Sequence, residues 1–132
     1  MTRLILLDAG SNSIDDLSGI GMLSELRRLF LDRNKFSSID GLESLRRLEE
    51  LDLSNNPLRS TAQISSLERL QRLNLNHTGI STLEDVLALG DLELLRVSDN
   101  PDLVCDSISE AIREYGESAI RTDKTCPHPE DN

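Results

Sequence analysis

The stretch LEELDLSNNPL, residues 48–58, decides the fold because its spacing recurs along the chain in steps of 22 residues. Its first and fourth positions are leucine in all five copies. The first positions are Leu4, Leu26, Leu48, Leu70 and Leu92, and the fourth positions are Leu7, Leu29, Leu51, Leu73 and Leu95. A polar column follows, with Asn12, Asn34, Asn56, Thr78 and Asn100. The chain is therefore built from stacked copies of one unit.

Each copy predicts a strand followed by one short helical turn. Alternation around the leucines is typical of a strand, and a later i, i+3 spacing such as Leu42 and Leu45 favours a 3₁₀ turn. One copy cannot bury its leucines alone, so we expect five parallel strands packed side by side. The asparagine in each bend is expected to satisfy backbone groups with its side-chain amide. Thr78 lacks that amide, which predicts a weaker turn in the fourth copy.

The pattern Leu-x-x-Leu-x-Leu-x-x-Asn resembles the leucine-rich repeat family, in the 22-residue class of bacterial internalins and a phosphatase-regulatory group. The resemblance covers about residues 4–113. It implies an α/β, right-handed solenoid with five parallel strands on a concave face. Short 3₁₀ or helical turns are expected on the convex side, and a capping helix at the C-terminal end. We expect a solenoid over residues 1–105 and a C-terminal cap and tail over residues 106–132.

The period fails after Pro101, where a capping helix is expected. Ser107 and Glu110 have the spacing of a capping box at a helix start, and Gly116 is a plausible helix end. The apolar face of this helix would cover the open end of the leucine core. That face consists of Ile108, Ala111, Ile112 and Tyr115.

The two cysteines flank the predicted helix. The run from Asn100 to Asp106 resembles the start of the cysteine-bearing C-terminal caps of secreted leucine-rich repeat proteins, which often hold four cysteines where this chain has two. The resemblance implies a structural Cys105–Cys126 disulfide, worth roughly 3 kcal/mol for a loop of about 20 residues. An extracytoplasmic or secreted location would follow. The alternative is a pair of reduced, unrelated thiols in a cytoplasmic protein.

The first strand has no visible cap. Ile5 and Leu6 occupy positions that hold Arg27 and Arg28 in the second copy. An exposed apolar edge strand invites pairing with another chain. Three explanations stay open: a truncated chain, a removed signal peptide, or an interface through this edge.

The sequence carries no motif for catalysis, a metal or a cofactor, so we expect a protein that is not an enzyme and has no cofactor. Cys126-Pro127-His128 is at most half a metal site, because a second ligand pair with zinc spacing is missing. A net charge of −10 disfavours nucleic acid as the main partner. No apolar run reaches the roughly 18 residues of a membrane span, so no membrane insertion is expected.

The expected partner is another protein, bound by side chains that point outward between the strand leucines. Phe30 stands out there because only 2% of residues are aromatic, and aromatic and arginine side chains dominate binding hot spots. The alternative is that Phe30 merely covers neighbouring leucines. The predicted binding residues are Phe30, Arg28, Arg33, Asp32, Glu50, Asp52, Arg72, Asn74 and Arg96.

Three functions remain open at this stage. The first is a non-catalytic protein–protein recognition module that binds its partner on the concave face. The second is an acidic inhibitor or immunity-type protein of a basic enzyme, with a basic partner. The third is a structural subunit that associates through its uncapped first strand.

Overall fold

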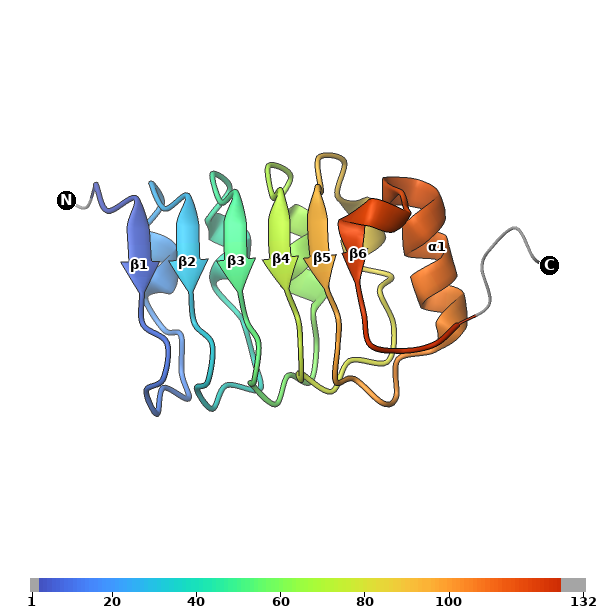
Figure 1. Cartoon of the computed structure of the whole chain (residues 1–132). Coiled ribbons are helices and arrows are strands. Elements are labelled where there is room, and N and C mark those ends of the chain that lie inside the picture. The colour runs from blue at the N-terminus through green and yellow to red at the C-terminus, as the bar shows by residue number, and fades with distance from the viewer. Residues whose placement is uncertain (1–2, 127–132) are drawn as a thin grey trace.

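The computed structural model describes residues 3–126 and contains one sheet of six parallel strands in sequence order. Each leucine-rich copy contributes three residues of strand, and each strand pairs with the strand of the next copy (Figure 1). The strands are β1 (Leu6–Asp8), β2 (Arg28–Phe30), β3 (Glu50–Asp52), β4 (Arg72–Asn74), β5 (Leu94–Arg96) and β6 (Ile120–Arg121). The predicted solenoid of five parallel strands is confirmed, and a sixth strand extends it.

The first four of these pairings keep the 22-residue register, whereas the last one does not. Leu7 lies beside Leu29 and Leu73 beside Leu95, but Leu95 lies beside Ile120, 25 residues later. The 22-residue period does not predict β6, because a helix lies between β5 and β6 and because an isoleucine stands where the repeat has leucine.

Short 3₁₀ helices line the side of the coils away from the sheet (Figure 1). They are η1 (Ile20–Met22), η2 (Leu42–Ser44), η3 (Ala62–Ser66) and η4 (Val86–Ala88). Gly41, which precedes η2, has φ of 105°, and a Cβ there would lie 3.0 Å from Cγ2 of Ile20. Glycine therefore allows the first and second coils to approach each other at this point.

The core lies between the sheet and the 3₁₀ helices and is built from the repeated leucines. Leu26, Leu48 and Leu70 are fully buried, as are their partners at the fourth position of each copy. Leu4, in the first copy, is 39% exposed, and Leu7 is half-buried. The difference arises because the first coil has a neighbour on one side only.

The asparagine column connects each bend to its neighbours. The Asn56 side-chain amide donates to the carbonyl oxygens of Leu53 in its own coil (3.0 Å) and Leu31 in the preceding coil (2.9 Å). Its Oδ1 accepts a hydrogen bond from the backbone N–H of Asn34 at 3.1 Å. Buried backbone groups at the bends are thus paired across coils, as predicted.

Thr78 makes fewer of these connections. Its hydroxyl donates to the carbonyl oxygen of Leu75 in its own coil at 2.8 Å. Among the residues that the structure describes, its side chain forms no hydrogen bond with the preceding coil. The Asn56 N–H, which an asparagine at position 78 could pair, has no hydrogen-bond acceptor within residues 3–126. This supports the interpretation of a weaker turn in the fourth copy.

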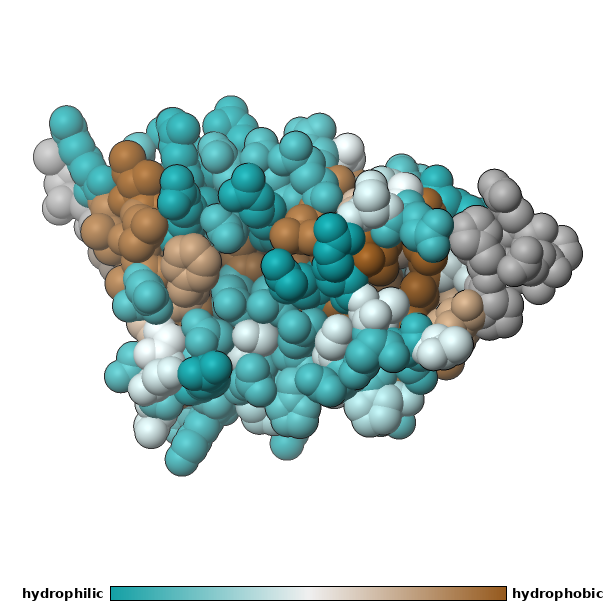
Figure 2. Space-filling model, viewed as in Figure 1, coloured by the Kyte–Doolittle hydropathy of each residue, from teal (hydrophilic) through white to brown (hydrophobic). Residues whose placement is uncertain are grey.

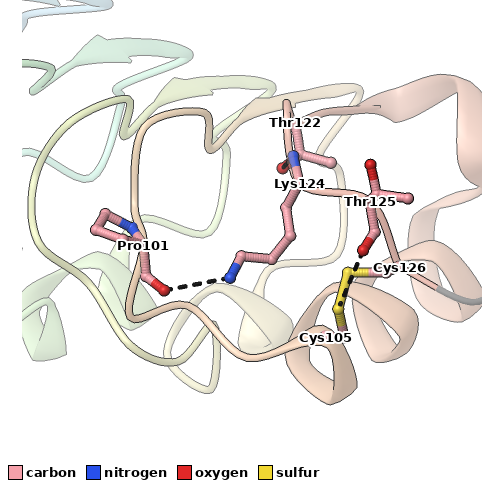
Figure 3. The surroundings of a disulfide bond; sticks show 6 residues. All are labelled: Pro101, Cys105, Thr122, Lys124, Thr125 and Cys126. Carbon is pink, nitrogen blue, oxygen red and sulfur yellow. Dashed lines mark hydrogen bonds between the residues drawn. A yellow bond between two sulfur atoms is a disulfide. The ribbon is translucent and has the colours of Figure 1, made fainter.

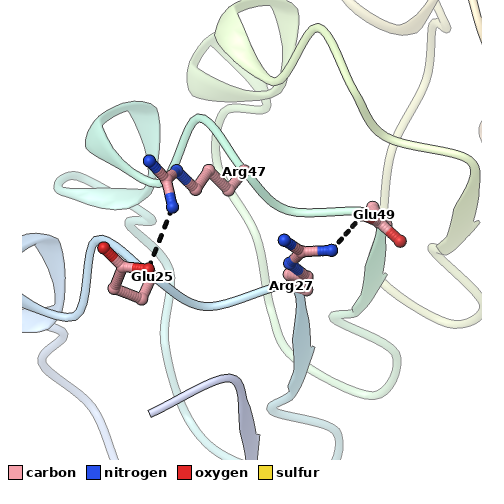
Figure 4. A network of polar contacts seen from close by, with 4 residues as sticks. All are labelled: Glu25, Arg27, Arg47 and Glu49. Atoms are coloured by element: carbon pink, nitrogen blue, oxygen red, sulfur yellow. Dashed lines mark hydrogen bonds and ion pairs between the residues drawn. The ribbon is translucent and has the colours of Figure 1, made fainter. Parts of the chain in front are cut away.

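Charged side chains also connect neighbouring coils, at the side where the chain enters the strands (Figure 4). Arg47 pairs with Glu25 at 2.9 Å, and Arg27 pairs with Glu49 at 3.7 Å, in each case 22 residues apart. All four side chains remain substantially exposed, so each pair contributes at most about 1 kcal/mol.

The C-terminal cap is helix α1 (Cys105–Tyr115), and it begins two residues before the predicted capping box. Val104 is the N-cap residue, whereas Ser107 lies inside the helix and is buried. The capping-box prediction was therefore wrong. Burial of the first turn against the solenoid, together with the acidic Asp106 near the helix N-terminus, takes the place of a serine cap. The helix ends at Gly116 with φ of 90°, as expected.

The apolar face of α1 closes the core as predicted, with Ile108 and Ala111 fully buried. The Tyr115 hydroxyl reaches back to the fourth coil, 2.7 Å from the carbonyl oxygen of Val86 and 2.6 Å from that of Leu89. The chain then passes through η5 (Glu117–Ala119) into β6.

A disulfide joins Cys105 at the start of α1 to Cys126 after β6, with their Cα atoms 5.5 Å apart (Figure 3). Beside it, Lys124 Nζ donates to the carbonyl oxygen of Pro101 at 3.2 Å. The predicted boundary between the solenoid (residues 1–105) and the cap (residues 106–132) remains a prediction, because β6 belongs to the sheet of the solenoid but lies within the predicted cap. Residues 127–132 of the predicted tail lie outside the described residues.

Candidate protein-binding site

The outward side chains of the six strands form one continuous surface, which we call the concave face. Parallel pairing in register aligns them in two columns across the sheet. Figure 2 shows hydrophilic side chains over much of this face, apolar atoms gathered at its β1 end, and further apolar atoms toward its β5–β6 end. The columns are Leu6, Arg28, Glu50, Arg72, Leu94 and Asp8, Phe30, Asp52, Asn74, Arg96, Arg121.

Six of the nine predicted binding residues surround one shallow pocket on this face. They are Phe30, Glu50, Asp52, Arg72, Asn74 and Arg96. Leu51, Leu73 and Leu94 complete the lining, and these three leucines are not among the predicted binding residues. The pocket volume is about 150 Å³. Small-molecule sites usually measure about 300–1,000 Å³, so this hollow is better suited to a protruding side chain of a protein partner.

The other three predicted residues lie beside this pocket rather than in it. Arg28 is exposed on β2, two residues before Phe30 and on the same face. Asp32 and Arg33 follow the end of β2, and Arg33 has φ of 58° in the bend. The same left-handed conformation recurs in all five coils, at Ser11, Arg33, Asn55, His77 and Asp99. Arg33 is exposed and does not line the pocket, so its role in partner binding stays a prediction.

Phe30 is half-buried between the acidic side chains of neighbouring strands, Asp8 on β1 and Asp52 on β3. Its partial exposure leaves apolar ring surface available to a partner. The same partial burial fits the alternative in which the ring covers strand leucines. Whether Phe30 is a binding residue therefore stays a prediction.

The acidic groups of the concave face are engaged within the chain. Asp52 Oδ1 accepts hydrogen bonds from the Ser54 backbone N–H at 2.9 Å and the Ser54 hydroxyl at 2.6 Å. Glu50 lies 3.7 Å from the Arg72 guanidinium. Within residues 3–126, the guanidinium groups of Arg28 and Arg96 have no hydrogen-bond or ion-pair partner. The arrangement presents fixed carboxylates beside two arginines that are free to bind.

Two other features of the described chain concern metals and membranes. No group of three or more histidine, cysteine or acidic side chains within residues 3–126 is placed to hold a metal ion. Pro127 and His128, part of the half-site considered above, lie outside these residues. None of the helices in residues 3–126 has the length and apolar character needed to cross a membrane.

Solved structures with the same fold include bacterial leucine-rich repeat proteins. A leucine-rich repeat protein of Leptospira interrogans matches with a TM-score of 0.76 and 26% identity, over 89% of this chain and 30% of that one. Internalin C2 of Listeria monocytogenes matches with a TM-score of 0.78 and 24% identity, over 90% of this chain and 51% of that one. An internalin, InlF, from the same organism matches with a TM-score of 0.64 and 18% identity, over 92% of this chain and 43% of that one.

The chain thus spans about a third to a half of the length of these proteins. No curated protein sequence matches the chain significantly. The family model "Leucine Rich repeats (2 copies)" matches residues 24–69 and 46–89, which together make up half of the chain. The stacked coils, the asparagine column and this match agree, and the chain belongs to the leucine-rich repeat family.

Proposed function

We propose that the protein is a non-catalytic recognition module that binds another protein on its concave face. The observation that supports this most directly is the pocket, where Phe30, Arg72 and Arg96 surround a hollow on a rigid sheet. The backbone of strands that pack on a core is held in place before a partner arrives, which lowers the entropic cost of binding. Arginine and aromatic residues are also the types that carry most binding energy at interfaces.

The test replaces Phe30 by alanine and compares the capture of partners with that by the unchanged protein. Immobilised protein is incubated with extract of the source cells, and bound proteins are quantified by mass spectrometry. We expect Phe30→Ala to deplete a specific partner at least tenfold, since hot-spot truncations cost about 2 kcal/mol or more. Met22→Ala is the matched control, because Met22 is 79% exposed and lies on η1, away from the concave face.

Equal melting temperatures for the two variants would show that any loss of capture is not due to unfolding. A partner that remains bound to Phe30→Ala, and also to Arg96→Ala, would contradict binding on the concave face.

A second candidate is self-association through the first coil, which the distribution of exposed apolar side chains favours. Leu4, Ile5, Leu6 and Met22 are exposed at this end, and the half-buried Leu7, Ile14 and Leu23 line a hollow of about 290 Å³ there. Ile5→Lys would abolish a concentration-dependent increase in mass, measured by light scattering. Val104→Lys is the control, because Val104 is also exposed (54%, against 52% for Ile5) but lies beside α1. A constant monomer mass at all concentrations would exclude this candidate.

The interpretation as an acidic inhibitor of a basic enzyme has less support on the concave face. Its outward strand positions hold four arginines and three carboxylates, so the excess negative charge of the chain lies elsewhere. A basic partner would have to contact other surfaces.

We further propose an extracytoplasmic location, supported by the Cys105–Cys126 disulfide, because such bonds persist in oxidising compartments. Thiol titration of denatured, non-reduced protein from the native host should find no free thiol. Two free thiols would favour a cytoplasmic location.

A further inference from the structure

We infer that the concave face binds an acidic segment of its partner that also carries a large apolar side chain. This inference rests on the proposed function and specifies the partner's chemistry. The whole chain has a net charge of −10, yet the outward strand positions sum to +1. The arginines there are Arg28, Arg72, Arg96 and Arg121, and the carboxylates are Asp8, Glu50 and Asp52.

The positive charges are concentrated at one end of the face. Strands β4, β5 and β6 present Arg72, Arg96 and Arg121 and no carboxylate at their outward positions. All three carboxylates lie on β1 and β3. The outward positions of β4–β6 therefore carry positive side chains only, although the molecule as a whole is acidic.

The three carboxylates are engaged within the chain, and so are Arg72, which pairs with Glu50, and Arg121, which donates to the Ser118 carbonyl oxygen. Asp8 Oδ1 accepts a hydrogen bond from the Gly10 N–H at 3.1 Å, and Glu50 and Asp52 are engaged with Arg72 and Ser54. Arg96, by contrast, is exposed, and its guanidinium has no partner among the described residues. A free guanidinium presents a fork of donors that matches the two oxygens of a carboxylate. A partner carboxylate is the group that would satisfy it.

The opposite end of the face offers apolar contact. Leu6 on β1 is 45% exposed, and Phe30 on the neighbouring strand is half-buried. The apolar atoms at this end are visible in Figure 2. Phe30 and Arg96 are three strands apart, about 14 Å at the usual strand spacing of 4.8 Å. An extended peptide covers that distance with about four residues, and a helix with about nine.

The partner segment is thus expected to place an aromatic or large aliphatic side chain near Phe30 and a carboxylate near Arg96. A nucleic acid would also supply negative charge, but the excess acid of the rest of the chain would repel a long polyanion. A short acidic peptide needs only the concave face.

A library of random 16-residue peptides displayed on phage tests this inference. The full chain is immobilised, and peptides enriched after selection are synthesised and measured by fluorescence anisotropy. We expect an excess of Asp and Glu together with large apolar residues. Arg96→Glu should weaken the enriched peptide about five- to thirty-fold, because it removes an ion pair and adds a repulsion. Arg96→Gln should weaken it less.

Arg46→Glu is the matched control, because Arg46 is exposed, lies outside the strands and has no ion-pair partner among the described residues. It should leave the affinity within about twofold, since Arg46 is not an outward strand residue of the concave face and salt screens an exposed charge. The inference would be overturned if the selected peptides were rich in Lys and Arg. It would also be overturned if selected acidic peptides bound Arg96→Glu as tightly as the unchanged protein. A single-stranded oligonucleotide that competes as well as the peptide would overturn it too.

Phe30→Ala separates this inference from the proposed function. If it abolishes binding of a peptide that is not acidic, the concave face still binds protein and only the charge argument fails. If selection yields no peptide that depends on either Phe30 or Arg96, both the inference and the proposed function fail.

Discussion

Replacing Thr78 by asparagine should stabilise the protein, because it would complete the asparagine column. By analogy with Asn56, the new amide would donate to the carbonyl oxygen of Leu53, and its Oδ1 would accept from the Asn56 N–H. Two buried hydrogen bonds contribute about 2 kcal/mol together. Loss of the threonine methyl group from this buried position subtracts about 0.8 kcal/mol. The net gain is about 1 kcal/mol in the free energy of unfolding.

For a chain of this length, such a gain corresponds to a melting temperature about 4 °C higher. Differential scanning calorimetry measures the shift, and urea denaturation gives the free energy independently. The reverse substitution, Asn56→Thr, is the matched experiment. It would leave the Asn34 N–H and the Leu31 carbonyl without their inter-coil partner, at a cost of about 2–4 kcal/mol.

The two variants must shift stability in opposite directions for the argument to hold. A Thr78→Asn protein no more stable than the unchanged one, together with a nearly neutral Asn56→Thr, would show that the column does not stabilise the stack. Hydrogen exchange at the Asn56 amide adds a local measurement, since Thr78→Asn should slow it.

Three further predictions concern the cap and the core. Burial of the Tyr115 hydroxyl raises its pKa above the ordinary value of 10. The hydroxyl must be protonated to donate to its backbone acceptors. The contribution of Tyr115 to the free energy of unfolding should therefore be complete below pH 10 and should fall as pH rises through the raised pKa. Absorbance titration measures this directly because Tyr115 is the single tyrosine, and Tyr115→Phe should remove the pH dependence. Cys126→Ser should lower stability by about 3 kcal/mol, and a reducing agent should destabilise the unchanged protein but not this variant. Leu51→Ala should cost about 2–5 kcal/mol in urea denaturation, whereas Leu7→Ala, in the half-buried first coil, should cost less.

The positions that the sequence predicted correctly are those that repeat. Leucine at the fourth position of each copy predicts a buried strand residue, because one face of each strand must pack against the core shared with the next coil. The same periodicity brought Glu50, Arg72 and Arg96 to one face, since parallel strands in register align equal positions.

The features that the sequence did not predict are those where the period ends or the backbone bends. Strand β6 and the start of α1 depend on packing against the last coil, which no local pattern encodes. Arg33 lies three residues after the end of β2, in a left-handed bend, and it does not line the pocket that contains Phe30. A column of small or polar residues at the position of Arg33, where Ser11 and Asn55 also lie, is the signal that could have indicated the bend.

The two ends of the stack are stabilised unequally, which should determine the order in which the coils unfold. The last coil is held by α1, β6 and a disulfide, whereas β1 has a neighbour on one side only. Because each coil contacts only the coils next to it, thermal opening should begin at β1 and advance one coil at a time. Phe30 on β2 would then be released while the arginines of β4–β6 are still in place. If the concave face binds a partner as proposed, then near the melting temperature contacts with Phe30 should be lost before contacts with those arginines.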